Sequence, residues 1–332
     1  MNDAYGRRID YLRLSVTDLC NYRCIYCMPD SGVPKKEHSE VLSVEECIDV
    51  AAQSARCGVR KVRVTGGEPL VRHGILDICR GIAEIGGIGE LCLTTNGSLL
   101  GGFARSLREA GVDRLNVSLD TLRPERFASL TRRGSLTDVL EGVDAALRAG
   151  FGRLKFNVVL MGGVNDDEIP DFVALTRERP VEVRFIELMP IGECADWDRS
   201  RFVGGSRVLE ACPDLRPTDT DGVAARYRIP GYAGTVGLIR PLSHKFCSEC
   251  NRIRVTADGK LKPCLHSEAE IPLKGLRGEA LFRAIRGGIL QKPLQHEMER
   301  LGSQSVFSRS SRTVDDVEQC IGGFQLFGCE RA

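Results

Sequence analysis

The chain has 332 residues, of which 42% are hydrophobic and 27% charged, and its formal net charge is +1 at pH 7. This length allows one large α/β domain, or a domain of about 200 residues with an elaborated C-terminal region. The near-neutral charge gives no general attraction to nucleic acid or anionic lipid, so we expect no nucleic-acid partner and expect any anion site to be local.

Hydropathy indicates the compartment. No apolar run approaches the roughly 18 residues that a membrane span needs, and the first residues, MNDAYGRRID, lack the apolar stretch of a secretory signal. We therefore expect a cytoplasmic protein with no membrane partner. In a reducing compartment, the 14 cysteines are expected to bind metal or pack in the core rather than form disulfides.

Short β-type runs alternate with helical stretches over the first 190 or so residues. Two of the intervening segments, 43–58 and 136–150, have helical spacing and end in glycine, as helices commonly do. Strands that alternate with helices predict a parallel sheet. The expected strands are YLRLS at 11–15, KVRVT at 61–65, LCLTT at 91–95, RLNVSL at 114–119, LKFNVVL at 154–160 and VEVRFIEL at 181–188.

Polar or functional residues follow these strands. Periodicity alone does not separate an open doubly wound sheet from a barrel, but barrel enzymes build their sites from the carboxyl ends of strands. We therefore predict an incomplete (βα)6 TIM-type barrel over residues 1–191, followed by a C-terminal region over residues 192–332. The residues expected at the mouth of the barrel are Thr17, Asp18, Cys20, Gly66, Gly67, Glu68, Thr95, Asn96, Asp120 and Met189.

The first cysteine group is Cys20, Cys24 and Cys27, spaced C-x3-C-x2-C. Three thiolates can hold a [4Fe–4S] cluster with one iron left open, whereas electron-transfer clusters are normally closed by four cysteines. The open iron can chelate S-adenosylmethionine, and one electron can then cleave the sulfonium bond to give a 5′-deoxyadenosyl radical. The alternative is a zinc site closed by His38 or His73.

The motif TGGEP at residues 65–69 favours the cluster. A glycine pair at a strand end allows a ligand to approach the backbone closely. The carboxylate of Glu68 is then expected to be available to the ammonium group of that ligand.

A second cysteine group lies in FCSECNRIRVTADGKLKPCL, residues 246–265. Cys247 and Cys250 form a C-x2-C pair, and Cys264 returns after a predicted hairpin at Asp258-Gly259. The group predicts either a second [4Fe–4S] cluster whose open iron faces the substrate, or a zinc site completed by His244 or His266.

Several cations lie in or near these motifs. Arg252 and Arg254 alternate along a strand and should point to the same side, either as a solvated face or as part of a phosphate site. Arg63 and Lys155 lie within predicted parallel strands, where a charge is costly unless it is paired. Together with Arg13, these cations could hold a triphosphate.

The first cysteine group, with Tyr26 before its last member, and the GGEP motif resemble the radical SAM superfamily. The resemblance implies that Tyr26, Gly67, Ser118 and Met189 contact S-adenosylmethionine. From the residues alone, Ser118 could equally be a plain strand serine and Met189 a core residue.

From about Arg8 to Gly323 the motifs together resemble the GTP 3′,8-cyclase family of molybdenum cofactor biosynthesis. The segments that carry this resemblance are LRLSVTDLCNYRCIYCMP, VRVTGGEPLVR, LTTNG, NVSLDTL, KFNVVLM, RFIELMP, YAGTVGLIRP and CNRIRVTADGKLKPCL. The resemblance implies two [4Fe–4S] clusters, abstraction of the C3′ hydrogen of GTP by the adenosyl radical, and 3′,8-cyclo-7,8-dihydro-GTP as the product. It also implies that the two clusters face each other across the barrel mouth, with GTP between them. The implied GTP contacts are Arg13, Arg63, Thr94, Lys155, Arg252 and Arg254.

The resemblance further implies an electron donor such as flavodoxin or ferredoxin, transfer of the product to cyclic pyranopterin monophosphate synthase, and a homodimer. Two other functions stay open: a radical SAM peptide-maturing enzyme with an auxiliary cluster, and a non-catalytic iron–sulfur or zinc redox sensor. Family members commonly end at a Gly-Gly tail that enters the active site. Here nine residues, FQLFGCERA, follow Gly322-Gly323, and the sequence does not decide whether they block that insertion.

Overall fold

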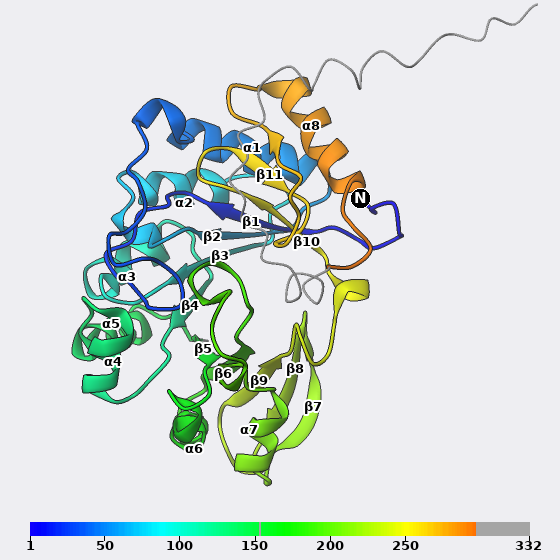
Figure 1. Cartoon of the computed structure of the whole chain (residues 1–332). Helices are drawn as coiled ribbons and strands as arrows, with labels where there is room; N and C mark the ends of the chain where they lie inside the picture. The colour runs from blue at the N-terminus through cyan, green and yellow to red at the C-terminus, as the bar shows by residue number, and fades with distance from the viewer. Residues whose placement is uncertain (153, 297–332) are drawn as a thin grey trace, which may run out of the picture. The chain divides into compact units, whose positions relative to one another are not determined.

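The computed structural model describes residues 1–152 and 154–296, and their strands form one 12-stranded sheet (Figure 1). The strand order is β12-β11-β10-β1-β2-β3-β4-β5-β6-β9-β8-β7. Six neighbouring strands run parallel in chain order and make up the barrel core. They are β1 (Tyr11–Ser15), β2 (Lys61–Thr65), β3 (Glu90–Thr95), β4 (Arg114–Ser118), β5 (Lys155–Leu160) and β6 (Glu182–Glu187).

These strands confirm the sequence prediction to within one residue at each end. The two predicted helices are also present, and the first begins after a capping box: Ser43 Oγ accepts from the Glu46 N–H at 3.1 Å, and the Glu46 carboxylate accepts from the Ser43 N–H at 2.9 Å. The helices are α1 (Val44–Arg56), α2 (Ile75–Ala83), α3 (Leu100–Glu109), α4 (Pro124–Thr131), α5 (Leu136–Arg148), α6 (Ile169–Ala174), α7 (Ser206–Ala211) and α8 (Gly278–Leu290). No helix among the described residues is long and apolar enough to cross a membrane.

The two faces of the sheet differ in chemistry because side chains alternate along each strand. Leu12, Val62, Leu93 and Val117 lie on one face and are buried in a single hydrophobic core with residues of the helices α1 to α5. The other face, called here the polar face, carries the side chains that pair across neighbouring strands, such as Arg63 with Thr94. A closed TIM barrel fills its interior with branched apolar residues, so a polar face indicates a site for a polar ligand.

Strands from the C-terminal region extend both edges of this core. β9 (Thr235–Ile239) pairs in parallel with β6, and β10 (Arg252–Val255) pairs in parallel with β1. The sequence did not predict β7 (Arg216–Asp221), β8 (Ala224–Arg228) or β9, and β11 (Lys260–Lys262) and β12 (Ile271–Pro272) complete the sheet. The sheet remains open between its outermost strands, β12 and β7, which confirms the prediction of an incomplete barrel.

Candidate active site

The first cysteine group lies on the loop that follows β1. Cys20 and Cys24 are half-buried and Cys27 is exposed. Although part of the Cys27 side chain is exposed, the protein around its thiol removes enough water to raise its pKa, and the neighbouring Cys20 and Asp120 raise it further. The pKa of Cys24 is raised by burial, Asp120 and both other thiols. The three thiols therefore lie close enough to raise one another's pKa, and a bound metal would deprotonate them and offset the repulsion between their charges.

Three thiols from one loop are a donor set that fits a cluster with an open iron. Across residues 1–152 and 154–296, no group of three or more His, Cys, Asp or Glu side chains is placed to hold a single metal ion. The fit to an iron–sulfur cluster rests on the chemistry of these thiols and on their mutual electrostatic coupling.

The GGEP loop after β2 packs directly against the cysteine loop. The backbone N–H groups of Gly67 and Glu68 donate to the carbonyls of Thr17 and Leu19, each at 2.9 Å. A Cβ on Gly67 would lie 2.4 Å from the Leu19 carbonyl oxygen, so only glycine permits this approach. The glycine pair thus brings two loops together, in addition to the ligand approach that the sequence suggested.

Glu68 corrects a sequence interpretation. Its side chain is fully buried and accepts hydrogen bonds from the Leu70 N–H at 3.0 Å, the Thr95 hydroxyl at 2.8 Å and the Asn96 N–H at 2.6 Å. The carboxylate therefore joins the GGEP loop to the loop after β3 and is not available to the ammonium group of a ligand. It holds Asn96, whose side-chain amide donates to Asn21 at 2.8 Å and lies 3.9 Å from the Cys20 sulfur.

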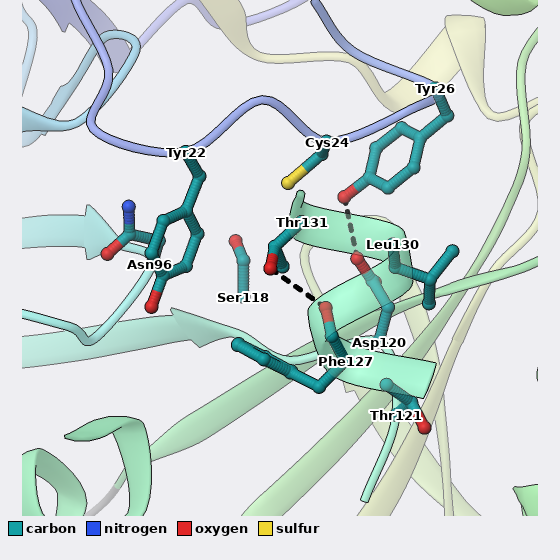
Figure 2. Close-up of a pocket in the computed structure, with 10 residues that line it drawn as sticks. All are labelled: Tyr22, Cys24, Tyr26, Asn96, Ser118, Asp120, Thr121, Phe127, Leu130 and Thr131. Atoms are coloured by element: carbon teal, nitrogen blue, oxygen red, sulfur yellow. Dashed lines mark hydrogen bonds between the residues drawn. The ribbon is translucent and has the colours of Figure 1, made fainter. Parts of the chain in front are cut away.

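A cavity beside the first cysteine group is lined by Cys24, Tyr26 and Ser118 (Figure 2). The Tyr26 hydroxyl donates to Asp120 Oδ2 at 2.7 Å, and Asp120 Oδ1 accepts from the Val159 N–H at 2.8 Å. The fold thus brings two of the residues expected to bind S-adenosylmethionine next to a cysteine of the group. The full lining is Tyr22, Cys24, Tyr26, Asn96, Ser118, Asp120, Thr121, Phe127, Leu130 and Thr131.

The other two residues of that set lie nearby but outside this cavity's lining. Gly67 lines an open cavity of about 580 Å³ together with Ser15, Thr65 and Arg254. Met189 follows β6, and its carbonyl accepts from the Cys194 thiol at 3.1 Å. Cys194 in turn is close enough to influence the pKa of Cys27, so the loop after β6 also reaches the cysteine group.

Four arginines cluster where β10, β1 and β2 lie side by side. The strand register pairs Arg254 with Arg13, and Arg13 with Arg63. Burial lowers the pKa of Arg254 to about 9, and the charges of Arg13 and Arg252 add to the effect. Within the described part of the chain, Nε of Arg13 and Nη2 of Arg252 are buried without a hydrogen-bond partner. Buried guanidinium nitrogens without a partner fit an anion site better than a solvated face.

The remaining residues expected to bind GTP also lie on the polar face. Arg63 Nη1 donates to the Thr94 hydroxyl at 3.2 Å, and Arg63 Nε donates to the Tyr11 hydroxyl. Lys155 is buried and is already engaged: its Nζ lies 2.9 Å from Glu182 and also pairs with Asp221 at the end of β7. No motif in the sequence marked this second carboxylate.

The second cysteine group lies at the opposite end of the strands from the first. β10 runs parallel to β1, and Cys247 and Cys250 precede it, whereas Cys20 follows β1. Cys264 follows β11, which is antiparallel to β10 and so ends near the start of β10. The expectation that the two groups face each other across one mouth is therefore wrong. The arginine cluster lies on the strands between them.

Two residues of this site were noted in the sequence only as strand-end polar groups. Asn96 and Asp120 follow β3 and β4, and each contacts the cysteine loop through the bonds given above. Their position after strands was the available signal, but their partners depend on tertiary contacts. Gly322 and Gly323 lie outside the described residues.

Comparison with known proteins assigns the family. Residues 14–176 match the radical SAM superfamily model, and residues 181–298 match the model for Molybdenum Cofactor Synthesis C. The fold also resembles SuiB of Streptococcus suis, with a TM-score of 0.60 at 14% identity over 90% of this chain and 75% of that chain. GTP 3′,8-cyclase of Alkaliphilus oremlandii is 48% identical over 303 residues, which are 90% of this chain and 95% of that protein. The same enzyme of Peptoclostridium acidaminophilum is 50% identical over 303 residues, 90% of this chain and 93% of that protein, and the chain therefore belongs to the GTP 3′,8-cyclase family of radical SAM proteins.

Proposed function

We propose that the chain converts GTP into (8S)-3′,8-cyclo-7,8-dihydroguanosine 5′-triphosphate, the first step of molybdenum cofactor biosynthesis. The observation that carries this function is the arginine cluster of the polar face, which lies on strands that have one group of three cysteines at each end. A substrate bound there would lie between two iron–sulfur clusters, and relatives that share 48–50% identity over 90% of the chain are GTP 3′,8-cyclases.

Cys20, Cys24 and Cys27 are proposed to hold the cluster that, when bound, supplies the electron for cleavage of S-adenosylmethionine. Tyr26, Gly67, Ser118 and Met189 would orient that cosubstrate. The close packing of the GGEP loop against the cysteine loop supports this role, because a rigid cradle fixes the position of the sulfonium group. Cys247, Cys250 and Cys264 are proposed to hold the second cluster.

Arg13, Arg63, Thr94, Lys155, Arg252 and Arg254 are proposed to bind GTP. The four arginines repel one another and lie partly buried, so a triphosphate would relieve an unfavourable concentration of charge. The unpartnered donors of Arg13 and Arg252 supply hydrogen bonds to phosphate oxygens. These side chains hold the nucleotide; they do not exchange protons with it.

Further features are proposed on the same basis. The chain works in the cytoplasm with an electron donor such as flavodoxin or ferredoxin, and it passes its product to cyclic pyranopterin monophosphate synthase. It forms a homodimer. Residues 1–191 form the radical-generating core, and residues 192–332 contribute the second cluster and the arginines of β10.

The test is anaerobic incubation of the reconstituted chain with GTP, S-adenosylmethionine and a reductant, followed by identification of the product. We expect cyclised GTP and 5′-deoxyadenosine, with about eight iron atoms per chain and about half of them lost when Cys247, Cys250 and Cys264 become alanine. Cleavage of S-adenosylmethionine without consumption of GTP would refute the proposal and favour a peptide-maturing enzyme. Failure to form 5′-deoxyadenosine in the presence of GTP would favour a redox sensor.

A further inference from the structure

A buried lysine lies beside the second cysteine group. Lys292 follows α8 by two residues, and only 3% of its surface is exposed. Its Nζ donates to the carbonyl oxygen of Arg252 at 2.8 Å and to that of Pro263 at 2.9 Å. No sequence motif marks this residue, and the proposed function does not use it.

The two carbonyls belong to the two segments that carry the cysteines. Arg252 lies two residues after Cys250, and Pro263 directly precedes Cys264. One ammonium group therefore bridges two segments that are also joined by the ladder between β10 and β11. Its hydrogen bonds fix the separation between the Cys250 and Cys264 backbones.

The charge of Lys292 also lies close to sulfur. Its two hydrogen bonds to backbone carbonyls hold the ammonium group between the segments of Cys250 and Cys264, and its charge, with that of Arg252, acts on the Cys250 thiol. A buried ammonium is tolerated when it is hydrogen-bonded and paired with negative charge, and a metal-bound thiolate is such a partner.

The first cysteine group has carboxylates near it where Cys250 has cations. Cys24 and Cys27 both lie near the carboxylate of Asp120, and Cys27 also lies near Glu193. Hydrogen bonds to cluster sulfurs and nearby positive charge raise the reduction potential of a cluster, whereas nearby carboxylates lower it. The fold therefore places carboxylates near Cys24 and Cys27 of the first group and cations near Cys250 of the second.

We propose that Lys292 is a positioning residue of the second cluster, which holds its two ligand segments together and raises its reduction potential through the positive charge that it places beside Cys250. As a result, the second cluster is reduced at a less negative potential than the first. This inference rests on the proposed function, because it requires a cluster at Cys247, Cys250 and Cys264.

The test isolates the second cluster in the full-length chain, by replacing Cys20, Cys24 and Cys27 with alanine. In this background, Lys292→Met removes the charge and the donors at nearly constant length, and Lys292→Arg keeps them. Lys260→Met is the matched control, because Lys260 lies on the same hairpin but pairs with Glu270 at 2.9 Å. The measurements are iron content after anaerobic reconstitution, and the midpoint potential followed by electron paramagnetic resonance.

We expect Lys292→Met to shift the midpoint potential by about 59 mV in the negative direction. For one electron this shift lowers the ratio of reduced to oxidised cluster about tenfold at a fixed potential. Lys292→Arg and Lys260→Met should stay close to the background protein. An unchanged potential in Lys292→Met at full iron content would overturn the inference, because a purely structural lysine would not move it.

If Lys292→Met alone loses iron, a further variant is measured in its place. Lys292→Gln keeps an N–H donor without the charge, and its potential should also fall; an unchanged value would overturn the inference. If the background protein itself binds no iron, the proposal of a second cluster fails, and this outcome is distinct from a failure that concerns Lys292 alone.

Discussion

The hydroxyl of Tyr26 donates a hydrogen bond to Asp120 Oδ2 at 2.7 Å, and this bond joins the first cysteine loop to the end of β4 (Figure 2). Asp120 is itself fixed by the Val159 N–H of β5. The cysteine loop is therefore anchored to the sheet on the β4 side by Tyr26, as it is anchored on the β2 side by the GGEP loop.

Tyr26→Phe should loosen this anchor. We expect a loss of about 1 kcal/mol in the free energy of unfolding, because a buried hydrogen bond to a carboxylate is removed. Hydrogen exchange should increase in the loop at residues 20–28, and the cluster should be lost faster in air. Tyr232→Phe is the control, since its hydroxyl only accepts from Arg177 at 3.3 Å at the surface. Equal exchange in both variants would contradict this role of Tyr26.

Glu68→Gln should destabilise the chain strongly. The amide group of glutamine would turn an N–H toward donors that now bond to a carboxylate, at a cost of about 2 kcal/mol or more in the free energy of unfolding. Chemical denaturation of the apo chain measures this loss. Glu84→Gln, on an exposed residue at the end of α2, should change little. If the two variants are equally stable, the Glu68 carboxylate does not stabilise the fold by joining the GGEP loop to the loop after β3.

Asp221→Asn should strengthen GTP binding. Asp221 pairs with Lys155 and lies 2.6 Å from Arg184, so its charge opposes a phosphate in the same region. Removing that charge should lower the dissociation constant of GTP by about threefold or more. Anaerobic calorimetry measures the change, and Asp219→Asn on the same strand, paired with Arg226, is the control. Weaker binding in Asp221→Asn would show that the carboxylate organises the site instead.

Arg254→Ala should weaken GTP binding by about tenfold or more and leave the iron content unchanged. Burial, Arg13 and Arg252 all disfavour the charge of Arg254. Loss of this charge should therefore not lower the free energy of unfolding of the apo chain. The comparison is with Arg228→Ala, an exposed arginine at the end of β8. Unchanged affinity for GTP would remove Arg254 from the binding site.

Tyr11 gives a prediction on pH. Burial would raise its pKa, but the charges of Arg63 and Arg13 outweigh burial and lower it to about 8. The unfolded phenol titrates near pH 10, at about its ordinary value, so the unfolded chain holds more protons between the two values. The stabilisation from Tyr11 is therefore complete above about pH 10 and is lost as the pH falls through about 8.

Phenolate absorbance of the apo chain measures this titration. A phase near pH 8 should disappear in Tyr11→Phe and should shift upward when inorganic triphosphate is added, because the anion offsets the arginine charges. Persistence of the phase in Tyr11→Phe would assign it to another tyrosine.

The sequence predicted the local features of this fold well. Strands such as Tyr11–Ser15 and Lys61–Thr65 were found at their predicted positions because alternation is a property of a short segment. The cysteine spacings likewise carry their chemistry within a few residues. In contrast, β7 has mostly exposed polar residues with no apolar alternation, and its sequence gives no strand signal.

Long-range placement could not be read from the sequence. The pairing of β10 beside β1 decides that Cys250 lies at the far end of the strands from Cys20, and no local pattern encodes a strand's partner. The same reason applies to Lys155, whose partner Asp221 comes from a hairpin more than sixty residues later. Glu68 was predicted to face a ligand because it follows a strand. Its hydrogen bonds to Thr95 and Asn96, which come from another strand end, could not be read from the local sequence.

The addition of β9 to β6 and of β10 to β1 has a consequence for dissection of the chain. A fragment that ended at residue 191 would leave two strands with unpaired N–H and C=O groups, and such edges template aggregation. The C-terminal segment therefore completes both edges of the parallel sheet formed by the first segment. Chimaeras with relatives should exchange both edge strands as a pair, and recombination between them is expected to yield insoluble protein.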